Sequence, residues 1–81
     1  MSQPNQGTVV QIIGPVLDIR FPADALPRLL NAITVTAPDG RVVTAEAAQH
    51  IGQDTVRCIA MQSTDGLVRG LPASDTGAPI T

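Results

Sequence analysis

Apolar and polar residues alternate with a period of two along most of this chain, as is typical of β-strands with one buried face. The clearest run is 31–37, which Pro38-Asp39-Gly40 separates from a second run, 41–50. Gly40 tolerates a positive φ, so the pattern predicts a β-hairpin here. The alternation places Leu17, Ile19 and Phe21 on one face of their strand, Ile33, Val35 and Ala37 on one face of the next, and Val43, Ala45 and Ala47 on one face of its partner.

Proline and glycine divide the rest of the chain into further short strands. Gly14-Pro15 lacks one backbone donor and permits a bulge. We therefore expect the strand ladder that begins at 8–13 to be interrupted at these two residues and to resume at 16–21. Segment 22–30 holds two prolines, so it can form at most one helical turn, which would plug a barrel end. The other predicted strands are 8–13, 16–21, 55–61 and 67–71, with turns at 51–54 and 63–66.

About six short strands without a helix to cover them predict an all-β fold. A small closed six-stranded antiparallel β-barrel of the Greek-key type is favoured, because closure removes unpaired strand edges. The predicted organisation is a flexible N-terminus at 1–6, a barrel at 7–72 and a linker-like segment at 73–81. At 81 residues the chain is one small domain, whose core supplies only a few kcal/mol of stability.

Some predicted strands are apolar on both faces. The residues concerned are Val9, Val10, Ile12 and Ile13 in the first strand and Val56 and Ile59 in a later one. A strand of a small barrel needs only one apolar face, so something must cover the other. A partner subunit is the simplest cover.

Composition excludes several classes of protein. The chain carries five arginines, no lysine and a formal net charge of −2, so it lacks the basic face of a nucleic-acid binder. Without lysine it cannot be a lipoyl- or biotin-carrier domain. Cys58 is the only cysteine, which rules out an intrachain disulfide and favours a reducing compartment. The first seven residues lack the pattern of a secretory signal, and no apolar run reaches transmembrane length.

No set of residues assembles into a catalytic, cofactor or metal site. The phosphate loop G-x-x-x-x-G-K-[ST] is absent, and His50 is a single imidazole, which we interpret as a hydrogen-bonding residue at a strand end. Cys58 reads as a small core residue. Asp65-Gly66 reads as a turn because the spaced acids of a calcium loop are missing. Ser63, Asp65 and His50 do not sit in a nucleophile-elbow pattern.

Arg57 and Arg69 are the two arginines that we weigh as interface residues. Arginine pairs bidentately with carboxylates and is enriched where subunits meet. A solvated face is the alternative, and we favour the interface.

Several segments, in order, resemble the opening of the ATP synthase β subunit. They are 7–19, 21–22, 26–27, 31–35, 48–52, 56–57, 59–61, 64–70 and 75–80. The related α subunit and the vacuolar-type and export ATPases share the barrel, but GPVLD at 14–18 and QHIG at 49–52 favour β. Ala47, Cys58 and Gln62 stand where the family commonly has Val, Thr and an acid. Ala45 and Ala47 thin the core by a few methyl groups.

The resemblance implies a non-catalytic barrel that joins others, from alternating α and β subunits, into a ring. It implies that α subunits are the partners on both sides of the barrel. It also implies that stalk subunits bind the rest of the full-length β subunit, which we call the parent subunit. ATP, ADP and Mg²⁺ would bind in a domain that follows, where the parent makes or hydrolyses ATP coupled to proton transport. The expected location is peripheral, on the cytoplasmic face of a bacterial inner membrane, without membrane insertion.

Two other readings stay open. A free-standing oligonucleotide-binding barrel would stack bases on aromatic side chains along a basic groove, and one Phe with no Lys argues against it. An enzyme is the least favoured of the three interpretations, because these residues do not supply a nucleophile, a base and a group to orient the base.

Overall fold

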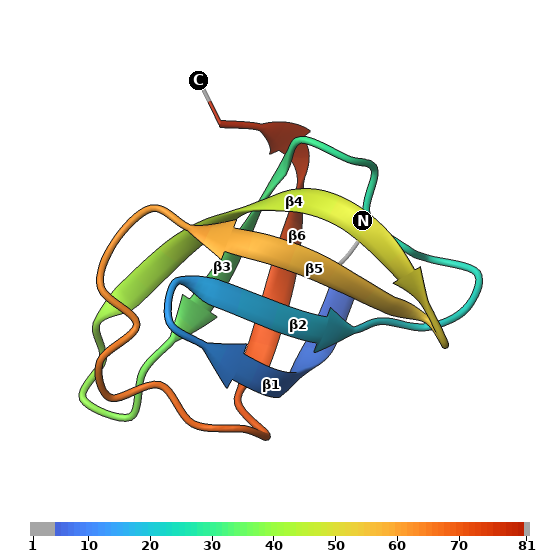
Figure 1. Ribbon diagram of the computed structural model, residues 1–81. Helices are drawn as coiled ribbons and strands as arrows, with labels where there is room; N and C mark the ends of the chain where they lie inside the picture. Colours follow the sequence, from blue (N-terminus) through green and yellow to red (C-terminus); the bar gives the residue numbers. More distant parts are fainter. Residues whose placement is uncertain (1–4, 81) are drawn as a thin grey trace.

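The computed structural model describes residues 5–80, which form six antiparallel strands and no helix. The strands are β1 (Asn5–Ile13), β2 (Val16–Arg20), β3 (Asn31–Thr36), β4 (Val42–Gly52), β5 (Thr55–Ala60) and β6 (Pro72–Pro79). They close into a barrel in the order β1-β2-β5-β4-β3-β6 (Figure 1). β3, β4 and β5 are joined by hairpins, and β6 returns beside β3, which is a Greek key. The predicted fold class is therefore confirmed.

The hairpin at 38–40 is present as predicted. Thr36 pairs with Val42 at the end of the β3–β4 ladder, and Gly40 has a φ of 92°. Ala37 N donates to Arg41 O at 2.8 Å and closes the turn. The local turn chemistry therefore fixes the register that points alternate side chains of both strands inward.

The prediction for Gly14-Pro15 was wrong. These two residues form a hairpin turn in which Ile13 pairs with Val16, so the chain reverses and does not continue in one direction. Gly14 has a φ of 55°, which a tight reversal needs and glycine adopts without steric cost. The irregularity of β1 lies earlier, between Val9 and Gln11, where the β1–β2 register shifts.

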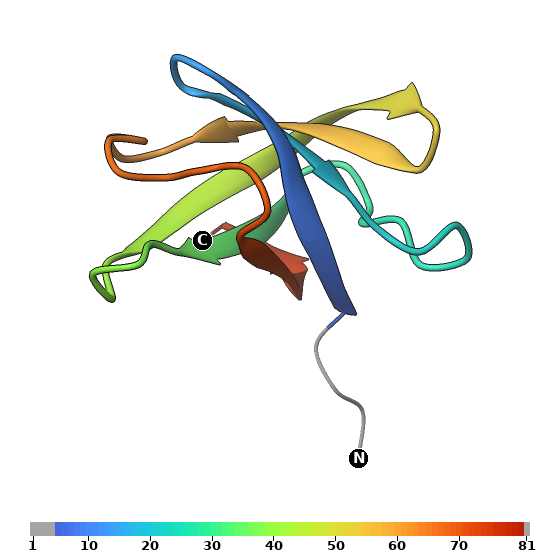
Figure 2. The same cartoon turned by 90° about the horizontal axis from the view of Figure 1, so that it is seen from below.

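The last strand is β6, so the prediction of a strand at 67–71 followed by a linker-like segment was also wrong. Residues 67–71 form a loop that buries Leu67 and includes Gly70 at a φ of 94°. Pro72 opens β6 and Pro79 ends it, positions where a missing amide proton is tolerated. β6 pairs with both β1 and β3 and so closes the barrel, as Figure 2 shows from below.

The boundaries at the N-terminus also differ from the prediction. Asn5 and Gln6, expected in a flexible segment at 1–6, belong to β1 and pair with Asp75 and Ser74 of β6. The remainder of that predicted segment lies outside the described residues.

Segment 22–30 contains turns but no helical turn. Ala25 N donates to Pro22 O, and Asn31 N donates to Arg28 O. Pro27 is fully buried, and Leu26 packs partly against the core. The segment thus covers a barrel end as expected, but it does so with irregular chain and turns.

The core contains all nine side chains that the alternating pattern groups on one face of the strands at 16–21, 31–37 and 41–50, and six further apolar residues join them. The fifteen buried apolar residues are Val9, Leu17, Ile19, Phe21, Ala32, Ile33, Val35, Ala37, Val43, Ala45, Ala47, Val56, Cys58, Leu67 and Ala73. Phe21 is the only aromatic side chain among them. No helix in the part of the chain described is long and apolar enough to cross a membrane.

Candidate interaction surface

Asp18 and Arg57 form an ion pair on the outer wall of the barrel, where β2 pairs with β5. Arg57 Nε donates to Asp18 Oδ1 at 3.0 Å, and Arg57 Nη2 donates to Oδ2 at 3.1 Å. The Asp18 side chain is 6% exposed and that of Arg57 is 41% exposed. The hydrogen bonds and the charge of Asp18 raise the pKa of Arg57 above its ordinary value. The pair braces two strands that are far apart in sequence.

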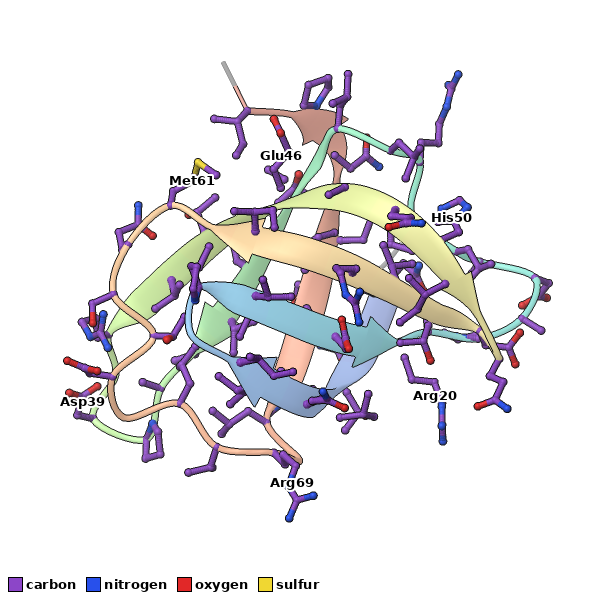
Figure 3. All side chains as sticks on the ribbon, in the orientation of Figure 1. Arg20, Asp39, Glu46, His50, Met61 and Arg69 are labelled. Carbon is purple, nitrogen blue, oxygen red and sulfur yellow. The ribbon has the colours of Figure 1, made fainter. Side chains whose placement is uncertain are left out.

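This ion pair gives Arg57 a role inside the chain, whereas the sequence suggested only an interface or a solvated face. The sequence contains both partners, since Asp18 and Arg57 both fall on outward positions of their strands. It does not show that β2 pairs with β5, and that pairing is what brings the two side chains together. Arg69 lies in the loop before β6 and is exposed, and its side chain points away from the barrel (Figure 3).

His50 is a hydrogen-bonding residue near a strand end, as predicted. Its Nε2 lies 2.7 Å from the carbonyl oxygen of Pro27, so Nε2 carries the proton that it donates. The bond connects the end of β4 to segment 22–30. The single imidazole thus holds a covering segment in place.

Cys58 is buried in the core, as predicted for a small apolar residue. Burial is the main reason that the pKa of its thiol rises from 9.0 to about 12, with the charges of Asp18 and Asp75 adding to it. Its Sγ lies 3.8 Å from Val56 O, a weak contact. The thiol therefore stays protonated and unreactive near neutral pH.

The barrel has two ends, and they separate the residues that might have formed a triad. In a closed antiparallel barrel the β1–β2, β3–β4 and β5–β6 connections share one end, which we call the turn end. The other, the terminus end, holds the β2–β3 and β4–β5 connections, the start of β1 and the end of β6. His50 lies near the terminus end, whereas Ser63 and Asp65 lie in the loop at the turn end. The structure therefore does not bring these three residues together.

The loop at 61–71 is held in place by side chains from neighbouring elements. Arg41 donates from Nη1 to Ser63 O at 2.8 Å and from Nη2 to Asp65 O. Thr64 Oγ1 donates to Gly14 O at 2.8 Å. Asp65-Gly66 forms the predicted turn. Among residues 5–80 there is no group of three His, Cys, Asp or Glu side chains that could hold a metal ion.

Large apolar side chains are exposed at both ends of the barrel. The turn-end group is Ile13, Val42, Ile59, Met61 and Val68, and the terminus-end group is Leu29, Leu30, Ile51 and Ile80. Figure 3 shows Met61 and His50 on opposite sides of the molecule. Of the strands expected to be apolar on both faces, Val9 and Val56 face the core, while Ile13 and Ile59 face outward.

A comparison with protein families agrees with this architecture. Residues 9–77, which include most of all six strands, match the family model described as "ATP synthase alpha/beta family, beta-barrel domain". The match spans well over half of the chain. The chain therefore belongs to the ATP synthase alpha/beta family and contains its β-barrel domain.

Proposed function

We propose that this barrel is the N-terminal assembly domain of the β subunit of a rotary, proton-translocating ATP synthase. Its role is to stabilise a ring of alternating α and β subunits without taking part in catalysis. The observation that carries the proposal is a closed barrel of the α/β family with large apolar side chains left exposed at both ends. Such exposed groups on a small domain mark interaction sites.

The assignment to β within the family rests on two stretches of sequence. They are GPVLD at 14–18, which forms the β1–β2 turn and most of β2, and QHIG at 49–52, which ends β4. The α subunit shares the domain, and these two stretches favour β over α. α subunits would then be the neighbours on both sides.

The parent subunit would carry the catalytic activity. By its resemblance to the β subunit, ATP, ADP and Mg²⁺ would bind in a domain that follows the barrel, and the barrel itself has no lysine to place in a phosphate loop. ATP synthesis and hydrolysis would be coupled there to proton transport through the stalk subunits. The complex would sit peripherally on the cytoplasmic face of a bacterial inner membrane.

Co-expression of full-length α and β subunits tests the assembly role. We expect native mass spectrometry to detect a hexameric ring with the intact β subunit and a large loss of ring when residues 5–79 are deleted. The downstream domain should keep its nucleotide affinity in the deleted form, which controls for misfolding. Rings that form equally well without the barrel would contradict the proposal.

A further inference from the structure

Aspartate is followed by glycine twice in this chain, at Asp39-Gly40 and at Asp65-Gly66. This dipeptide is chemically reactive, because glycine has no side chain to shield its backbone nitrogen from the aspartate carboxyl group before it. All four residues are exposed. Both pairs lie at the turn end, where the loop at 61–71 runs beside the β3–β4 turn (Figure 1). The two pairs differ in which of their atoms make hydrogen bonds.

The reaction joins the glycine nitrogen to the aspartate side chain. The nitrogen attacks Cγ and loses its proton, so that a C–N bond forms, and the C–O bond of the protonated carboxyl group breaks to release water. A second water molecule then opens the resulting succinimide ring. When it attacks the former backbone carbonyl, the bond from that carbonyl to the glycine nitrogen breaks, and the chain now runs through Cβ and Cγ as isoaspartate. Because one water leaves and one is taken up, the mass does not change.

At Asp39-Gly40 both reacting groups already make hydrogen bonds. Asp39 Oδ1 accepts from Arg41 N at 3.0 Å, and Gly40 N donates to Ala37 O at 2.9 Å. Both bonds must break before the Gly40 nitrogen can attack Cγ of Asp39. A hydrogen bond of ordinary net strength shifts such an equilibrium by about fivefold, so the fold protects this pair.

At Asp65-Gly66 the hydrogen bonds fall on atoms that do not react. Asp65 N donates to Ser63 Oγ at 3.1 Å, and Asp65 O accepts from Arg41 Nη2. Gly66 has a φ of 85°, which the turn requires. Within residues 5–80 the structure gives no hydrogen bond to the Asp65 carboxylate or to Gly66 N. The loop is therefore held around the reacting pair, while the pair itself stays free.

We propose that Asp65-Gly66 is a site of spontaneous modification, at which Asp65 isomerises to isoaspartate in the folded protein while Asp39 is protected. Isoaspartate lengthens the backbone by one carbon and displaces the carbonyl oxygen to which Arg41 Nη2 donates. The modification thus releases one of the two bonds by which Arg41 holds the loop at 61–71. The site is independent of the proposed function.

The first experiment compares the two pairs within one protein. Trypsin cleaves after arginine and so places the first pair on peptide 29–41 and the second on peptide 58–69. The purified chain is kept at physiological temperature and neutral pH for several weeks, in buffer and in concentrated guanidinium chloride. Mass spectrometry with electron-transfer fragmentation then distinguishes isoaspartate from aspartate in each peptide. The denatured sample gives the reactivity that each sequence has without the fold.

The ratio of isoaspartate at position 65 to isoaspartate at position 39 should be about tenfold higher in buffer than in guanidinium chloride, because two hydrogen bonds protect Asp39-Gly40 only in the fold. Equal ratios in the two samples would overturn the proposal. Isoaspartate that forms at position 65 in guanidinium chloride but not in buffer would also overturn it, since the folded loop would then protect Asp65.

The second experiment tests the effect on the loop, with Asp65→Glu as the matched control. Glutamate keeps the charge, but its ring would be one atom larger and closes far more slowly. Hydrogen exchange at 61–71 should become faster as isoaspartate accumulates in the wild type and stay constant with age in Asp65→Glu. Wild-type protein that gains isoaspartate without faster exchange would contradict the release of the loop. Equal loosening of the aged variant would assign the change to another process and overturn the role of Asp65.

Discussion

Asp18 and Arg57 are 39 residues apart in sequence, yet they face each other across the β2–β5 ladder through two parallel hydrogen bonds. The carboxylate is buried under the guanidinium, whose outer side remains in solvent. The arginine thus satisfies a carboxylate that would otherwise be desolvated without a partner. This arrangement makes the two residues unequal in their effect on stability.

Arg57→Leu should destabilise the barrel more than the double substitution Asp18→Leu with Arg57→Leu. The single substitution leaves a buried carboxylate without its partner, whereas the double substitution removes the charge that needed one. Urea unfolding of the three proteins measures the difference. A double variant that is less stable than Arg57→Leu would show that the ion pair is not the source of the effect.

The stability of the barrel should fall above about pH 9 because of Cys58. The pKa of this thiol is raised to about 12 in the fold, so between pH 9 and 12 the unfolded chain releases a proton that the folded chain retains. Stability is therefore full below pH 9 and falls by about 1.4 kcal/mol per pH unit above it. The chain has no Lys or Tyr, so few other groups titrate in this range.

Urea unfolding of the wild type and Cys58→Val at pH 7, 9.5 and 10.5 checks this prediction. Valine keeps an apolar side chain of similar size and cannot ionise. Its free energy of unfolding should stay nearly level over the same range. Parallel declines in the two proteins would assign the effect to another group.

Local turn chemistry explains which parts of the fold could be predicted from the sequence. Pro38-Asp39-Gly40 fixes a hairpin within a few residues, and the period of two then assigns inward and outward faces correctly. At Gly14-Pro15 the same residue types were compatible with both a bulge and a reversal. Only the pairing of Ile13 with Val16 decides between them.

Non-local pairing explains what the sequence could not show. β6 contains Pro72, Gly77 and Pro79, which locally favour a linker, and it is a strand because β1 and β3 bind its two edges. Within β6, Asp75 Oδ1 accepts hydrogen bonds from Asn31 Nδ2 and Gly77 N at 3.0 and 2.9 Å. The Asp18–Arg57 pair could not be predicted for the same reason. Its two residues meet only when β2 pairs with β5.

Gly7→Ala should destabilise the barrel by about 1–3 kcal/mol, the usual cost of forcing extra volume into a packed site. A Cβ at this position would lie 2.5 Å from Arg20 O and 2.8 Å from a ring carbon of Phe21. The backbone oxygen cannot move without disturbing β2. Thermal unfolding measures the effect, and Gln6→Ala, at the exposed neighbouring position, should leave stability within about 0.5 kcal/mol of the wild type.

Arg41→Ala should loosen the loop at 61–71 while leaving the rest of the barrel ordered. Arg41 holds two carbonyl oxygens of this loop at an exposed site, so its loss removes local restraint without opening the core. Hydrogen exchange should become faster at 61–71 and remain unchanged in β2 and β5. Arg41→Lys should restore only part of the protection, because an ammonium is a point donor and lacks the planar fork that reaches both oxygens. Equal protection in all three proteins would show that the bonds of Gln62 and Thr64 are sufficient to order the loop.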